Sequence, residues 1–343
     1  MPTETPTRFL PMVVLVGLVA GIVLTAGFIL IQGESGAVHG KPHHVRVAVV
    51  GESPQAQEAK AVLEHGGAFR VIAASDEADA LNLVRHRKAD GVVDPDARLL
   101  ETAQAASQPA AGVLTALSQT ALHDLGLRPQ EIAPLSRHDS SGIGLLFTTL
   151  GLVLGGLPAG LLLSLTSQNR RPRSVAEAGV RILIIVLYST VVALIVAAMV
   201  APEIGYKGTD AVAIWAWGTA LVAAAMAVGA ALASLIGIAS VPIALLGIFT
   251  FGIASAPVPV PWNFMPAFYR VLGPFFAPGA AADGIFRSIY FPAASNTHNM
   301  IVLGIWIAVP MVALLAMGWI AEHASVPSVS LADVEQRTPV PVG

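Results

Sequence analysis

Long apolar runs without charged residues alternate with short polar segments along this chain. Residues 140–168, 211–269 and 288–321 contain no Asp, Glu, Lys or Arg. A helix of a soluble protein turns a polar face to water, so an apolar run of more than about 18 residues is typical of a membrane span. The pattern therefore predicts an all-α polytopic membrane protein rather than a soluble protein with buried core helices.

The apolar pattern predicts six spans of a hydrocarbon core of about 30 Å, of which the fifth is given by its core at residues 241–254 and extends a little beyond it. They are residues 9–31, 142–165, 181–201, 211–233, 241–254 and 300–320. A cleaved signal peptide is the alternative for the first, but the apolar part of a signal is only about 7–15 residues long. We therefore expect an N-terminal anchor span in residues 1–35 and a five-span membrane domain in residues 141–321.

Residues 36–140 carry dense charges of both signs and predict a small α/β domain inserted between the first two spans. The expected strands are residues 45–50, 69–73, 91–93 and 131–135, and the expected helices are residues 53–65, 76–89 and an alanine-rich stretch at 97–125. In the second helix, the apolar side chains should face inward, which turns Arg85, Arg87 and Lys88 toward solvent.

Residues 258–299 are too apolar for a solvated loop and too rich in proline for one span. Aromatic and arginine side chains favour the headgroup level, so we expect two short re-entrant helices at the outer leaflet. Asp283 and Arg287 are spaced to pair on one helix face. Together with Arg270 they form a candidate outer gate. The alternative is an interfacial hairpin in which the ion pair has no functional role.

The loop after the second span contains Arg170, Arg171 and Arg173. Basic loops favour the cytoplasmic side of a membrane. This orientation places both termini in the cytoplasm, residues 36–140 outside the cell membrane, and residues 322–343 in a disordered cytoplasmic tail. The three arginines are candidates for contact with a cytoplasmic partner. The alternative is that they only set the topology.

The amino-acid composition limits the functional classes to which the protein can belong. Only 12% of the residues are charged, against about 25% in soluble domains. The net charge is −3, and the sequence shows no cluster of basic residues of the kind that binds nucleic acid. There is no cysteine, and His39, His43 and His44 lack the spacing of a metal site. We expect no catalytic, cofactor-binding or metal-binding residues, and therefore no enzyme.

Glycine and alanine are frequent in the span at residues 211–233 and just after it. Small residues such as Gly218, Gly229 and Gly237 allow membrane helices to approach closely. We expect this span to pack tightly, either against other spans of the same chain or along the seam of a homodimer.

The chain resembles the YhgE/Pip family of membrane proteins, which are relatives of type-two ABC exporter permeases. The matching residues are Ile132-Ala133-Pro134-Leu135, His138-Asp139-Ser140-Ser141-Gly142, Gly155-Gly156, Met265-Pro266, Leu272-Gly273-Pro274-Phe275-Phe276-Ala277-Pro278-Gly279-Ala280, Asp283-Gly284-Ile285-Phe286-Arg287 and Tyr290-Phe291. The resemblance implies one anchor span, an extracytoplasmic domain and five further spans, with short outer re-entrant helices before the last span.

Two functions follow from these features. The first is a transport permease that exports an amphiphilic or lipid-like molecule. The chain has no G-x-x-x-x-G-K-[ST] motif, so a separate ATPase subunit would have to bind the nucleotide. The second is a non-transporting surface scaffold or receptor connected with secretion or phage infection. A polar cavity among the spans favours transport, whereas an exposed apolar patch on the outer domain favours a scaffold.

Overall fold

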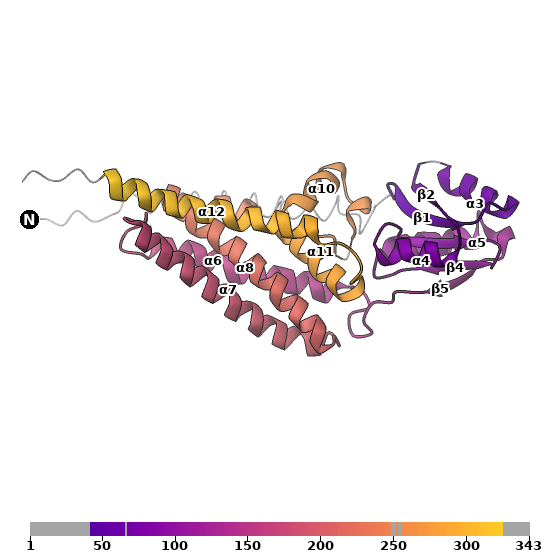
Figure 1. Ribbon diagram of the computed structural model, residues 1–343, viewed down its shortest axis with the longest axis horizontal. Coiled ribbons are helices and arrows are strands. Elements are labelled where there is room, and N and C mark those ends of the chain that lie inside the picture. The colour runs from indigo at the N-terminus through magenta and orange to yellow at the C-terminus, as the bar shows by residue number, and fades with distance from the viewer. Residues whose placement is uncertain (1–41, 66, 248–251, 253–254, 259, 325–343) are drawn as a thin grey trace, which may run out of the picture.

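The computed structural model describes residues 42–65, 67–247, 252, 255–258 and 260–324. An α-helical bundle and a small α/β domain lie end to end along the long axis of the molecule (Figure 1). We call the end of the bundle nearest the α/β domain the domain end, and the opposite end the loop end. The predicted anchor at residues 9–31 lies outside the described residues, as does the predicted tail beyond Ala324.

The α/β domain is built on a five-stranded sheet with the order β2-β1-β3-β4-β5. The strands are β1 (Val45–Val50), β2 (Phe69–Ala74), β3 (Gly91–Asp94), β4 (Leu99–Thr102) and β5 (Arg128–Glu131). The helices are α3 (Pro54–Glu64), α4 (Glu77–Arg85), α5 (Gln108–Gln119) and the short η1 (His123–Leu125). β1 pairs in parallel with β2 and β3, as helical connections require. The predicted α/β architecture is confirmed.

The alanine-rich stretch at residues 97–125, which we expected to be helical with an interruption near Pro109, is helical only in its later part. Its first part forms β4, which pairs antiparallel with β3. The turn between them is closed by the Asp94 carboxylate, which accepts a hydrogen bond from the backbone N–H of Ala97 at 2.9 Å. The prediction was wrong here because strand pairing overrides the helix propensity of alanine. β5 also ends where the predicted strand at residues 131–135 was to begin.

Four long helices of the bundle are apolar enough to cross a membrane. They are α6 (Ile143–Leu165), α7 (Val175–Glu203), α8 (Gly208–Ile236) and α12 (Thr297–Ala324). The longest of them reach about 43 Å at 1.5 Å per residue, more than a hydrocarbon core needs. They correspond to the second, third, fourth and sixth predicted spans, and α12 runs past Glu322 into the predicted tail.

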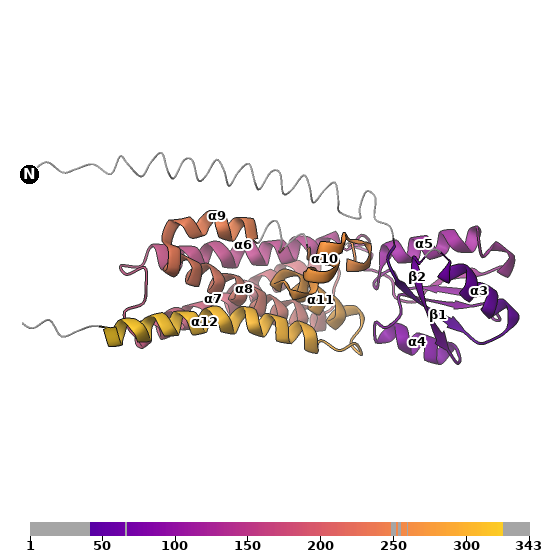
Figure 2. The same cartoon turned by 90° about the horizontal axis from the view of Figure 1, so that it is seen from above.

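The apolar stretch that contains α8 continues to Leu246, but it is not one straight helix. Gly237 has φ of +65°, a conformation that favours glycine, and the chain turns there through η2 (Gly237–Ala239) into α9 (Ser240–Leu246). Figure 2 shows α9 beside α6 at the loop end. α9 is the described beginning of the fifth predicted span, whose remainder lies largely outside the described residues.

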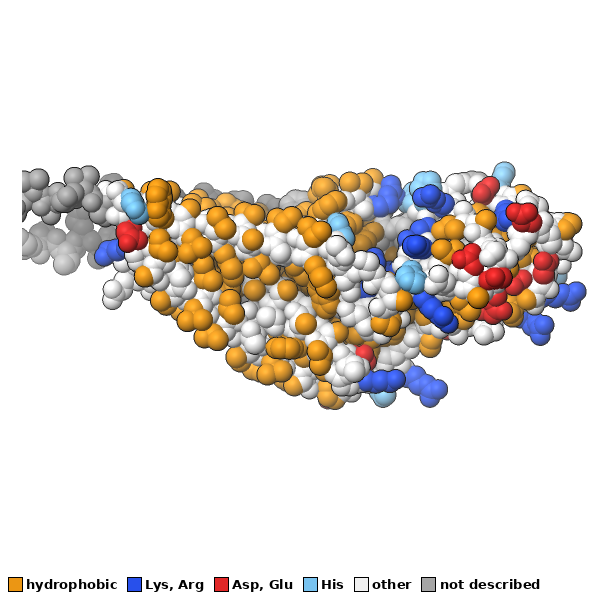
Figure 3. Space-filling model, in the orientation of Figure 1, with side chains coloured by type: hydrophobic (Ala, Val, Ile, Leu, Met, Phe, Trp, Pro, Cys, Tyr) orange, Lys and Arg blue, Asp and Glu red, His pale blue; other side chains and the backbone are white. Residues whose placement is uncertain are grey.

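α8 is the central helix of the bundle. The most apolar window of its stretch is 72% buried, against 22% for the corresponding windows of α7 and α12. The outward faces of α7 and α12 carry large exposed side chains such as Leu187, Met199 and Ile305. Apolar side chains cover the visible bundle surface, whereas charges concentrate on the α/β domain (Figure 3). This division of the surface is typical of a membrane protein with a water-exposed domain.

Small residues bring α6 and α8 into backbone contact. A Cβ atom on Gly156 would lie 2.7 Å from the Val222 carbonyl oxygen, and one on Gly229 would lie 2.6 Å from the Leu157 carbonyl oxygen. Gly218 is likewise packed, against Ala193 and Leu152. The predicted close packing of this span therefore occurs within the chain, except at Gly237, which makes a turn. A homodimer seam stays a prediction.

Candidate functional site

The segment between α9 and α12 folds back over the domain end of the bundle. It contains η5 (Trp262–Phe264), α10 (Ala267–Leu272), η6 (Gly273–Phe275) and α11 (Ala277–Tyr290). The two short helices expected in residues 258–299 are therefore α10 and α11. α10 exposes apolar side chains, including Phe268 and Val271. The segment thus presents an apolar surface outward while its second helix turns inward.

α11 is buried in the protein rather than laid against its surface. Every residue from Ala277 to Phe286 is buried. Gly284 lies against the indole ring of Trp217 on α8, so closely that an added Cβ atom would come within 2.7 Å. The Trp217 indole N–H also donates a hydrogen bond to the Ser288 hydroxyl at 2.9 Å. These contacts fix α11 against the central helix.

Asp283 is the centre of a buried ionic cluster on α11. Its side chain is 2% exposed. Arg287, one turn later, donates from Nε to the Asp283 Oδ2 atom at 2.5 Å, so the predicted pair forms. The Asn299 side-chain amide donates to the same oxygen at 2.9 Å. The Asp283 carboxylate therefore ties α11 to the start of α12.

The second cation of this cluster comes from the α/β domain. Arg87 Nη1 lies 2.9 Å from the Asp283 Oδ1 atom, across 196 positions of sequence. Arg87 Nη2 donates to the Ala106 carbonyl oxygen at 3.3 Å, and its guanidinium lies 5.4 Å from the Phe291 ring centroid. The side chain is only 11% exposed. The prediction that Arg87 faces solvent was wrong, because the surface of α4 there is covered by the bundle.

Backbone geometry directs Arg87 toward the bundle. The residue follows the end of α4 with φ of +53°, a left-handed conformation uncommon outside glycine and asparagine. Its carbonyl oxygen accepts a hydrogen bond from Arg46 Nη1 at 2.8 Å. The position after the end of α4, where glycine is common, is thus occupied by Arg87, and its left-handed backbone directs the charged side chain across the junction.

Electrostatics favour the ionised form of Asp283. Burial by itself raises the pKa of Asp283, but Arg87 and Arg287 act in the opposite direction and hold its pKa below the usual range. α11 is not one of the four spanning helices. A charged carboxylate between two guanidiniums is a strong, geometrically specific contact, and its loss would leave buried charges without a partner.

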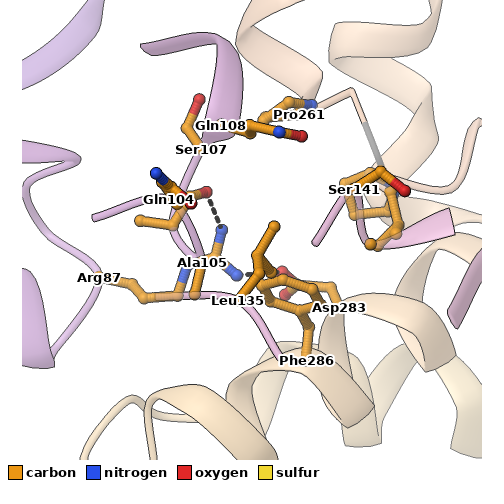
Figure 4. Close-up of a pocket in the computed structure, with 14 residues that line it drawn as sticks. Arg87, Gln104, Ala105, Ser107, Gln108, Leu135, Ser141, Pro261, Asp283 and Phe286 are labelled. Atoms are coloured by element: carbon orange, nitrogen blue, oxygen red, sulfur yellow. Dashed lines mark hydrogen bonds and ion pairs between the residues drawn. The ribbon is translucent and has the colours of Figure 1, made fainter. Parts of the chain in front are cut away.

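A small cavity adjoins this cluster at the junction of the two parts. Its volume is about 20 Å³, and its walls include Gln104, Ser141 and Phe286. Figure 4 shows Arg87 reaching from the α/β domain to Asp283 beside it. A polar space of this size suits about one water molecule. The space beside the cluster is therefore small.

Arg270, the third residue of the predicted gate, is separate from the cluster. Its Nη1 atom is buried and has no hydrogen-bond partner among the described residues. The structure thus brings together two of the three predicted gate residues and adds Arg87 and Asn299. The sequence signal for Asn299 is its place as a polar residue at the start of an apolar run.

The loop between α6 and α7 contains Arg170, Arg171 and Arg173, and we call it the arginine loop. It lies at the loop end, opposite the α/β domain (Figure 1). Arg171 donates to the carbonyl oxygens of Ser234 and Leu235 at 3.3 and 3.2 Å, so it caps the end of α8. The side chains of Arg170 and Arg173 are exposed. Of the three predicted partner contacts, Arg171 therefore has a structural role, and the other two remain accessible.

Sequence reasoning missed Arg181, which organises this loop from within α7. The side chain is 4% exposed and pairs with Glu177 at 2.7 Å. Its guanidinium also donates to the carbonyl oxygens of Asn169 and Arg170. Arg181 lies at the start of the apolar run at residues 181–201, and no local pattern distinguishes a loop-binding arginine from a helix-end charge.

An apolar cavity of about 230 Å³ lies among the helices of the bundle. Helices α6, α8, α9, α11 and α12 contribute to its wall. Val153, Ala224, Ile243, Pro278 and Trp306 are among the residues that line it. Because α11 closes one part of its wall, the cavity and the Asp283 cluster share the same short helix.

Among the described residues, no group of three or more His, Asp or Glu side chains could hold a metal ion. The features found at the site are buried charge at the junction, an apolar cavity and two accessible arginines. No significant match is found between this chain and protein-family models, curated proteins or solved structures.

Proposed function

We propose that this chain is a membrane permease that exports a lipid-like molecule with the help of a separate ATPase. The apolar cavity among the helices is the observation that carries the proposal. At about 230 Å³ it is larger than the roughly 150 Å³ apolar cavities that hold benzene in engineered proteins. Its lining of Val, Ile, Ala and Trp side chains suits hydrocarbon and would exclude a polar solute.

The arrangement around the cavity supports the same proposal. Buried α11 forms part of the cavity wall and carries Asp283, which binds Arg87 of the α/β domain. A shift of the α/β domain would therefore act on the helix that closes the cavity. The layout agrees with the resemblance to the YhgE/Pip family and to type-two ABC exporter permeases. In this proposal the α/β domain lies outside the cell membrane, and the arginine loop lies in the cytoplasm.

A scaffold or receptor is the second candidate, and the surface of the α/β domain gives it less support. No large hydrophobic side chain in the described residues 42–65 and 67–140 is among the exposed ones. A large contiguous apolar patch on a soluble domain would mark a docking surface for a protein partner. The large exposed apolar side chains lie instead on the bundle, where lipid would cover them.

Filling the cavity should abolish lipid binding inside it. Ala224 is 1% exposed and lines the cavity, so Ala224→Trp would occupy its volume. We expect native mass spectrometry of the purified chain, titrated with diacylglycerol, which has no phosphate group, to show bound lipid for the wild type and at least tenfold less for the variant. Leu187→Trp is the matched control because Leu187 is 57% exposed on α7. Equal lipid occupancy in Ala224→Trp and wild type, with both folded, would contradict the proposal.

An ATPase partner should depend on the accessible arginines. We expect the double change Arg170→Glu with Arg173→Glu to reduce ATPase copurification by tenfold or more, since two attractive charges become repulsive. Arg171 is left unchanged because it caps α8. The control is Arg70→Glu with Arg85→Glu, which alters two exposed arginines of the α/β domain. The cytoplasmic contact is wrong if ATPase recovery from the loop variant equals that from the control.

A further inference from the structure

A wide cleft lies at the domain end of α7 and α8, apart from the apolar cavity. Its volume is about 830 Å³. Its walls come from the linker at residues 134–138, the turn at residues 205–210 and the end of α11. We propose that this cleft binds the phosphate group of an anionic phospholipid. The inference needs the membrane placement of the helices but not transport.

The position of the cleft beside the ends of two spanning helices favours a lipid headgroup as its occupant. α7 ends at Glu203 and α8 begins at Gly208, so the turn between them lies where two spanning helices leave the hydrocarbon. The cleft opens beside this turn. Headgroup phosphates lie at the same level, next to the ends of spanning helices.

The charge of the cleft favours an anion. Arg137, His138 and Lys207 line it, and Asp210 is the one carboxylate in its lining. The Asp210 carboxylate already accepts a hydrogen bond from the Lys207 backbone N–H at 2.8 Å, which caps the start of α8. The positive end of the α8 dipole adds to the same field. Two permanent cations therefore line the space, and the nearby anions are Asp210 and the buried Asp139, whose charge acts on Tyr206 and Tyr290.

The uncharged part of the wall suits the remainder of a lipid. Tyr206 and Tyr290 lie edge to face with ring centroids 6.1 Å apart, and their hydroxyl groups are 3.3 Å apart. The Tyr290 hydroxyl also accepts a hydrogen bond from the Ser136 backbone N–H at 3.1 Å. Tyrosine rings are common at headgroup level. Ile289 and Pro292 extend this wall with apolar surface, which free phosphate would not use.

The test is a titration of the full chain in detergent, followed by native mass spectrometry. The probes are phosphatidylglycerol, phosphatidylcholine and inorganic phosphate. We expect phosphatidylglycerol to bind the wild type most tightly. The double change Arg137→Gln with Lys207→Gln should weaken that binding about 25-fold, or about fivefold for each charge removed. The control Arg70→Gln with Arg85→Gln removes two exposed charges of the α/β domain and should bind like the wild type.

The outcomes separate the possible ligands. Phosphatidylglycerol binding that is unchanged in the cleft variant, or weakened equally in the control, would overturn the site. Equal binding of phosphatidylcholine would show that anionic charge is not recognised. Inorganic phosphate that displaces phosphatidylglycerol at equal concentration would identify a free-phosphate site instead. If the double variant does not fold, each single change should still give the fivefold loss.

Discussion

Asp283→Ala should be the most damaging single substitution in the junction. The change removes a carboxylate that is 2% exposed and that binds two guanidiniums. Arg87, with 11% of its side chain exposed, would then lie in the junction without its anion. Breaking a buried ion pair in this way costs roughly 3–5 kcal/mol. We expect a lower thermal midpoint and a lower yield of folded protein in detergent.

Removing the cations as well should restore part of this loss. Asp283→Ala with Arg287→Ala leaves Arg87 unpaired, so its stability should stay below that of the wild type. Asp283→Ala with Arg87→Met should recover more, because Arg87 is the more deeply buried partner. The ionic cluster would have no stabilising role if Asp283→Ala unfolded at the wild-type temperature.

Gly160→Ala should disrupt the contact between α6 and α8. A Cβ atom at Gly160 would overlap the carbonyl group of Met226, which belongs to the backbone of α8 and has no rotamer in which to move aside. Overpacking of a tight core contact costs about 1–3 kcal/mol or more. We expect a lower thermal midpoint, measured on the purified protein in detergent.

Gly151→Ala on the same helix is the matched control. No atom lies within 4 Å of the Cβ position that this change creates. Alanine is the better helix former by about 1 kcal/mol, so the control should be neutral or slightly stabilising. Equal thermal midpoints for the two variants would mean that α6 and α8 are not packed through Gly160.

The spanning helices were predictable because lipid demands a long apolar run, and that demand is visible in the sequence. The residues at which the helices begin and end were harder to predict from the sequence. α7 begins at Val175 rather than at residue 181, because Ser174 caps it through a hydrogen bond from the Glu177 backbone N–H. Glu177 and Arg181 then lie inside the helix, where charge was read as the end of the apolar run.

Only the part of the ionic cluster that lies on a single helix, α11, was predictable from the sequence. Asp283 and Arg287 are four positions apart, and helical geometry places them together. Arg87 is 196 positions from Asp283, and its side chain direction depends on a left-handed backbone after α4. No local pattern contains that information. The apolar cavity was also invisible, because it depends on how five helices meet.

Outward movement of a lipid in inverted membrane vesicles tests the permease proposal most directly. In such vesicles the cytoplasmic leaflet faces the medium. A fluorescent lipid that remains in this leaflet is quenched when dithionite is added, whereas a lipid already carried to the lumenal leaflet is protected. For vesicles that contain this chain and its ATPase, we predict that ATP increases the protected fluorescence. Ala224→Trp should abolish that increase, whereas Leu187→Trp should retain it. Protection that is the same with and without ATP, or the same in Ala224→Trp as in the wild type, would contradict the account.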